Sequence, residues 1–128
     1  MARVLVVEDS QAMRSFVRAA LEEEGSETGN AIEVVEAASG FEALRLLPRG
    51  PYDCVVTDIN MPDINGLELV SFLKNHPVHR TIPIMVISTE SREEDRKRAA
   101  ALGAEEYLVK PFQATDLIEK LRRLLKVA

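Results

Sequence analysis

Five polar side chains along this chain are of types that could act together in one reaction: Glu8, Asp9, Asp58, Ser88 and Lys110. Each ends or directly follows a short run of apolar, often β-branched residues, which predicts a position at the carboxyl end of a strand. In open parallel α/β sheets, ligands bind at that edge. We therefore expect these side chains to converge in one cleft.

Three carboxylates brought together repel one another, and each raises the pKa of its neighbours. A divalent cation relieves this repulsion, and an oxygen-only set of Asp and Glu suits Mg²⁺, for which Mn²⁺ can substitute. The absence of nearby Cys or His argues against zinc. Lys110 adds a mobile positive charge and Ser88 adds a hydroxyl donor. A carboxylate nucleophile in these surroundings favours aspartyl-phosphate chemistry.

The elements that must position these groups alternate along the chain. Apolar runs predict strands at 4–7, 32–35, 54–56, 82–87 and 107–109. Apolar residues at helical spacing predict helices at 11–23, from 39 to 47, from 65 to about 75, from 91 to about 103, and around 117–125. Five strand–helix units in series predict an α/β fold, a doubly wound five-stranded parallel sheet with helices on both faces.

The starts of three helices are predicted by capping boxes, in which Ser or Asn is followed three residues later by Glu. Such boxes open the predicted helices at Ser39, Asn65 and Ser91. The segment 22–31 is polar and contains two glycines, which predicts a loop longer than usual before the second strand.

Composition narrows the class of protein. A chain of 128 residues with 46% hydrophobic residues is one domain's worth of sequence with a sizeable core. The net charge of −5 argues against nucleic acid as a partner, and no apolar run is long enough for membrane insertion. The single Cys54, expected in the core, fits a reducing compartment, so we expect a cytoplasmic protein.

Four stretches resemble the response-regulator receiver family, most closely its single-domain CheY-like members. They are residues 6–10, 57–66, 86–90 and 107–112, which read VVEDS, TDINMPDING, VISTE and YLVKPF. They occur in the family's order, and the resemblance covers the whole chain. It implies a flavodoxin-like strand order of 2-1-3-4-5 and a single receiver domain at 1–128 with no output domain.

The resemblance also implies roles for the acidic positions. Asp58 matches the phosphoryl acceptor, and Asp9 matches a direct metal ligand. Glu8 matches the neighbouring acid that holds the metal through water, although Asp is commoner there. The backbone carbonyl of Asn60 would complete the protein's share of the metal shell.

Further positions match the family's switching parts. Ser88 matches the switch hydroxyl, and Tyr107 matches the aromatic that turns inward when that hydroxyl moves. Lys110 matches the lysine that pairs with the phosphoryl group, and its bond to the following proline is cis in the family. Asn60 and Glu90 match the positions that tune acyl-phosphate lifetime, and their polar side chains favour a short-lived signal.

The partners implied are a histidine kinase or phosphotransfer protein as donor, and a protein target on the face formed by the fourth helix, fifth strand and last helix. The opening Ser10-x-x-Met13-Arg14 is similar to chemotaxis and motility regulators. Either a monomer or a phosphorylation-dependent dimer fits. We expect a signalling protein that catalyses only its own phosphorylation and dephosphorylation, rather than an enzyme.

Three alternatives stay open at this point. A phosphorylation-independent receiver-like interaction module usually lacks the acceptor, a metal acid or the lysine, all of which are present here. A Mg²⁺-dependent phosphohydrolase carries its nucleophile on the first strand in an Asp-x-Asp setting, a spacing that Glu8-Asp9-Ser10 lacks. A flavodoxin-like nucleotide binder needs a phosphate-cradling loop there, where two acids would repel phosphate.

Overall fold

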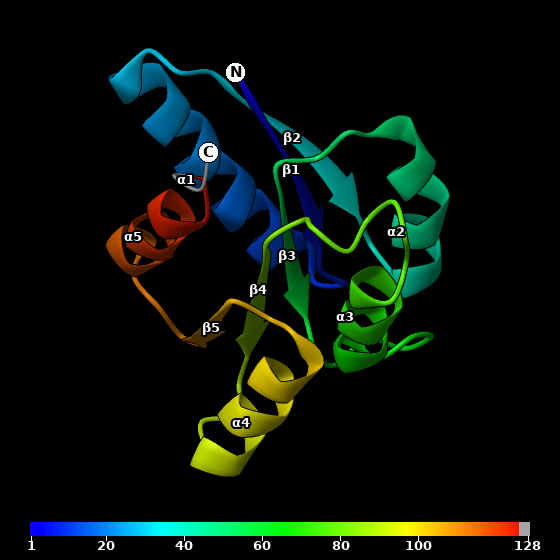
Figure 1. The fold of residues 1–128 in the computed structure, drawn as a ribbon. Helices are drawn as coiled ribbons and strands as arrows, with labels where there is room; N and C mark the ends of the chain where they lie inside the picture. Colours follow the sequence, from blue (N-terminus) through cyan, green and yellow to red (C-terminus); the bar gives the residue numbers. More distant parts are fainter. Residues whose placement is uncertain (126–128) are drawn as a thin grey trace.

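The computed structural model describes residues 1–125, and its strands form one parallel five-stranded sheet in the order β2-β1-β3-β4-β5 (Figure 1). The strands are β1 (Ala2–Val7), β2 (Ile32–Ala37), β3 (Cys54–Asp58), β4 (Ile84–Ser88) and β5 (Glu106–Val109). The predicted fold class and strand order are confirmed. The last three positions of the predicted domain, 126–128, lie outside the described residues.

Helices cover both faces of this sheet (Figure 1). They are α1 (Gln11–Thr28), α2 (Gly40–Leu46), the short 3₁₀ helix η1 (Leu47–Arg49), α3 (Gly66–Lys74), α4 (Glu93–Leu102) and α5 (Ala114–Leu125). Side chains alternate along β1, so Leu5 and Val7 pack in the core under α2, α3 and α4, whereas Val4 and Val6 pack in the core under α1 and α5. Burial on both faces explains the continuous apolar runs.

Helix α1 extends well beyond the predicted end at 23, and the expected long loop over 22–31 is wrong. Glu24 accepts two hydrogen bonds from Arg122 of α5, at 2.7 and 2.9 Å. A Cβ atom on Gly25 would lie 2.7 Å from the backbone nitrogen of Ile32, so glycine lets α1 approach β2 closely. The helix ends at Gly29, whose φ of 77° is left-handed. Contacts across the fold therefore maintain this polar stretch as helix.

The predicted caps are confirmed at two of the three helices. Ser39 accepts a hydrogen bond from the backbone of Glu42 at 3.1 Å, and Asn65 forms a complete capping box at the start of α3. The cap predicted at Ser91 is wrong, because α4 begins at Glu93 after Arg92, which makes no side-chain capping bond. Cys54 is buried in the core as expected. Within residues 1–125, no helix has the length and apolar character needed to cross a bilayer.

Candidate functional site

The five predicted site side chains lie at the carboxyl ends of four adjacent strands. Glu8 and Asp9 follow β1, Asp58 ends β3, Ser88 ends β4, and Lys110 follows β5. Because the sheet order places β1, β3, β4 and β5 side by side, their ends form one edge of the molecule (Figure 1).

The three acids form one cluster at this edge. Glu8, Asp9 and Asp58 each offer a carboxylate oxygen, and these oxygens all lie within 4.8 Å of one another. Glu8 is fully buried and Asp58 is 5% exposed, whereas Asp9 is exposed to solvent. Two buried oxygen ligands beside an exposed one fit a hard divalent cation that keeps part of its water shell.

Lys110 lies against the buried part of this cluster. Its Nζ is 2.7 Å from Glu8 Oε1 and 3.3 Å from Asp58 Oδ2. Burial raises the pKa of Glu8 above its ordinary value, and the charge of Asp58 adds to this, although Lys110 opposes it. Burial alone would lower the pKa of Lys110, but the hydrogen bond to Glu8 and the charge of Asp58 raise it overall. The lysine is therefore a permanent cation of the site.

Backbone groups fix the orientation of the two buried acids. The N–H of Ile59 donates to Asp58 Oδ1 at 2.7 Å, which leaves Oδ2 on the side of Lys110. The N–H of Ser10 donates to Glu8 Oε2 at 2.9 Å. The peptide bond between Lys110 and Pro111 is cis, as the resemblance implies.

Ser88 connects to Tyr107 through a single residue. Glu90 donates its backbone N–H to Ser88 Oγ at 2.9 Å, and its carbonyl accepts from the Tyr107 hydroxyl at 2.8 Å. Ser88 is fully buried and Tyr107 is 8% exposed. Within residues 1–125, Ser88 makes no hydrogen bond to Asp58, and its role as the switch hydroxyl stays a prediction.

The two positions expected to tune lifetime lie at the rim of the site. Asn60 and Glu90 each follow a strand end by two residues, and both are exposed. Their side chains are therefore open to water.

The segment that leads from β3 into α3 contains two residues whose structural importance the sequence analysis missed. A Cβ atom on Gly66 would lie 1.9 Å from the carbonyl oxygen of Asp58, and the Gly66 N–H donates to the Ile59 carbonyl at 2.8 Å. Only glycine lets α3 begin this close to the acceptor strand. A glycine immediately after a helix cap, where helix propensity disfavours it, was the available signal.

Asp63 is the second of these residues. Its carboxylate accepts the backbone N–H groups of Gly40 and Phe41, at 3.1 and 2.9 Å, in the first turn of α2. These backbone bonds, with one from Ile64, lower the pKa of Asp63 to about 2. Asp63 thus links the loop that follows Asp58 to the first turn of α2 through hydrogen bonds. No local pattern could reveal a cap supplied from 23 residues away.

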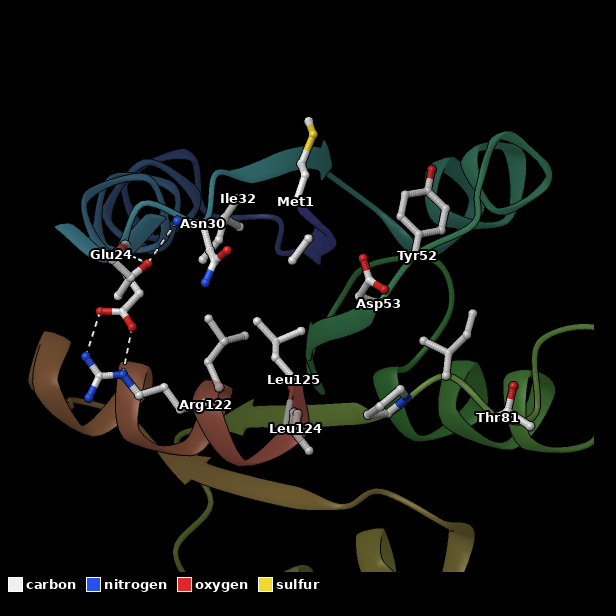
Figure 2. Close-up of a pocket in the computed structure, with 15 residues that line it drawn as sticks. Met1, Glu24, Asn30, Ile32, Tyr52, Asp53, Thr81, Arg122, Leu124 and Leu125 are labelled. Carbon is white, nitrogen blue, oxygen red and sulfur yellow. Dashed lines mark hydrogen bonds and ion pairs between the residues drawn. The ribbon is translucent and has the colours of Figure 1, made fainter. Parts of the chain in front are cut away.

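A hollow of about 670 Å³ lies at the opposite edge of the sheet, away from this chemistry. Figure 2 shows Asp53 and Leu125 beside this hollow and the Glu24–Arg122 pair at one side. None of the residues that line this hollow belongs to the acidic cluster. The site is an open, charged strand edge rather than a deep apolar cavity.

Comparison with known proteins matches this chain to one family. The family model described as "Response regulator receiver domain" matches residues 4–122. A probable transcriptional regulatory protein of Picosynechococcus is 39% identical over 132 residues, which cover 98% of this chain and 49% of the relative. The chain thus spans about half the length of that relative.

Two chemotaxis proteins of Vibrio cholerae are also similar. Chemotaxis protein CheY-3 is 34% identical over 124 residues, covering 97% of this chain and 92% of the relative. The solved structure of chemotaxis response regulator CheY4 superposes with a TM-score of 0.87 at 34% identity, covering 98% of this chain and 99% of that one.

Proposed function

The chain belongs to the response regulator receiver family, and on that premise we propose that Asp58 accepts a phosphoryl group from a histidine kinase or phosphotransfer protein. The observation that carries this proposal is the meeting of three carboxylates and one ammonium group at the strand edge. CheY-like receivers are signalling domains, and we infer that this chain acts on its own aspartate without turning over an external substrate.

In the transfer, an oxygen of Asp58 forms a bond to phosphorus while the bond from phosphorus to the donor's histidine nitrogen breaks. Asp58 Oδ1 is held by the Ile59 amide, so Oδ2, on the side of Lys110, is the oxygen better placed to attack. Lys110 then balances the negative charge that the phosphoryl group brings.

Glu8, Asp9, Asp58 and the backbone carbonyl of Asn60 would hold Mg²⁺, for which Mn²⁺ can substitute. The oxygen-only donor set of the acidic cluster fits such an ion. When bound, the ion supplies positive charge that stabilises the phosphoryl oxygens during transfer.

Phosphorylation draws Ser88 toward the new oxygens, and Tyr107 follows through Glu90. The surface formed by α4, β5 and α5 then changes shape and is read by a protein target, as a shift between two pre-existing states. The names of the Vibrio relatives support a role in chemotaxis or motility. We further propose a cytoplasmic protein that is monomeric or dimerises on phosphorylation, with Asn60 and Glu90 setting a short lifetime.

The test is incubation with acetyl phosphate and Mg²⁺, followed by intact-protein mass spectrometry. We expect one phosphoryl group on the wild type, none on Asp58→Asn, and none on the wild type after the metal is chelated. Asp53→Asn is the matched control, because Asp53 precedes the same strand at its other end and should label normally.

Equal labelling of the Asp58→Asn variant would contradict the proposal. An unlabelled wild type would favour the phosphorylation-independent module instead. Steady turnover of a generic phosphoester by the purified protein would favour the phosphohydrolase.

A further inference from the structure

Arg96 of α4 lies over the aromatic ring of Tyr107. Its guanidinium carbon is 5.3 Å from the ring centroid, within the range of a cation–π interaction. Within residues 1–125, Arg96 forms no ion pair, whereas Arg92, the residue just before this helix, pairs with both Glu94 and Asp95. The contact with the Tyr107 ring is therefore what orients the Arg96 side chain.

Tyr107 is held at two points by one short segment of chain. The carbonyl of Glu90 accepts its hydroxyl at 2.8 Å, and Arg96 covers its face. With both contacts made, only 8% of the residue is exposed. An outward rotation of the ring would break the hydroxyl bond and leave Arg96 without its partner.

The same two residues lie on the surface of α4, β5 and α5 that is proposed above to bind the protein target. Arg96 and Tyr107 border a hollow of about 220 Å³ between α4, β5 and α5, together with Lys120 and Glu106. Lys120 is paired with Glu106 at 3.4 Å. Outward movement of the ring would therefore release Arg96 and change both the shape and the charge of this hollow.

We propose that Arg96 is a positioning residue that holds Tyr107 inward and thereby sets the resting balance of the switch. The effect on the ring follows from the contact itself, and its consequence for signalling rests on the function proposed above. An exposed cation–π contact is expected to change the ratio of inward to outward ring about two- to fivefold.

The test uses fluorine NMR of protein labelled with fluorotyrosine. The chain has two tyrosines, Tyr52 and Tyr107, so a Tyr52→Phe sample assigns both resonances. We expect Arg96→Ala and Arg96→Gln to lower the ratio of inward to outward Tyr107 ring about two- to fivefold. This change should shift the Tyr107 resonance toward that of a solvent-exposed ring. Arg96→Lys should restore part of the inward state, because it keeps a cation near the ring.

Arg98→Ala is the matched control, because Arg98 is an exposed cation of the same helix and makes no ion pair among the described residues. It should leave the Tyr107 resonance unchanged. A Tyr107 resonance that is the same in wild type, Arg96→Ala and Arg96→Gln would overturn the inference. Alanine and glutamine favour helix, so these variants are expected to fold.

Adding acetyl phosphate and Mg²⁺ separates this inference from the function on which it rests. If phosphorylation fails to move Tyr107 in the wild type while Arg96→Ala does move it, the ring contact stands and the switching proposal fails. The opposite result is that wild type and Arg96→Ala have the same inward and outward populations of Tyr107 before phosphorylation and the same change after it. In that case the role of Arg96 fails and the switching proposal stands.

Discussion

Lys110 forms a closer ion pair with Glu8, at 2.7 Å, than the 3.3 Å at which it lies from Asp58. The lysine is therefore already paired with one of the proposed metal ligands in the unphosphorylated protein. Glu8 then has two tasks, because the same carboxylate that would help to hold the ion also places the ammonium group beside the acceptor.

This double task makes Glu8→Gln a sensitive variant. Removal of the charge takes away a metal-holding group and loosens Lys110, so we expect Mg²⁺ affinity to fall about tenfold or more. Calorimetric titration with Mg²⁺ measures the loss. Glu8→Asp keeps the charge and should recover most of the affinity, and Glu33→Gln, an exposed acid on β2, should bind as the wild type does. Unchanged Mg²⁺ binding by Glu8→Gln would contradict the assignment.

Ser88→Ala should separate phosphorylation from the response of Tyr107. The variant keeps Asp58 and Lys110 and should still accept a phosphoryl group, but the Glu90 N–H loses its acceptor at 2.9 Å. We expect the fluorine signal of Tyr107 to respond much less to acetyl phosphate, and stability to fall by about 1 kcal/mol. Ser88→Thr retains a hydroxyl and should respond normally; a full response in Ser88→Ala would exclude this route.

Gly66→Ala should damage the fold and the acceptor together. The added Cβ would lie 1.9 Å from the backbone oxygen of Asp58, and neither segment of main chain can move aside cheaply. We expect the free energy of unfolding in urea to fall by about 3 kcal/mol or more. Gly29→Ala is the control, because nothing lies within 4 Å there and only its left-handed φ of 77° costs about 1 kcal/mol. Equal losses would refute the close-approach argument.

The Glu24–Arg122 pair predicts a pH-dependent link between α1 and α5. The hydrogen bonds from Arg122 lower the pKa of Glu24 below its ordinary value of 4.5, despite the opposing effect of burial. A lowered folded-state pKa stabilises the protein above 4.5, and this contribution is lost as the pH falls through the lowered value. Glu24→Gln should therefore be less stable than wild type at neutral pH.

The difference between the two proteins should shrink as urea unfolding is repeated at successively lower pH. Glu23→Gln, on the exposed side of the same helix turn, should match the wild type throughout. A difference that stays constant from neutral to acidic pH would show that the effect of Glu24 is packing rather than charge.

Local sequence patterns could predict the sheet and the carboxyl-edge position of the site. The buried strands are short apolar runs, and polar residues such as Asp58 and Lys110 interrupt those runs where each strand ends. In a parallel sheet these interruptions all fall on one edge, so the cluster of Glu8 with Asp58 followed from the strand assignments alone.

The features that could not be predicted depend on partners far away in the chain. Helix α1 continues past 23 because Glu24 meets Arg122, 98 residues later. The first turn of α2 is capped by Asp63 from another loop, and α4 starts without the side-chain cap that Ser91 indicated. Each case is decided by tertiary contacts that override local propensity.

The two described ends of the chain share one place in the fold. Met1 and Leu125 both line the hollow at the edge of the sheet opposite Asp58 (Figure 2). A surface tether or fluorescent reporter attached at Met1 would therefore lie on the far side of the molecule from Asp58. Immobilised on a sensor chip by such a tether, the protein would present its acidic edge to dissolved donors without steric obstruction.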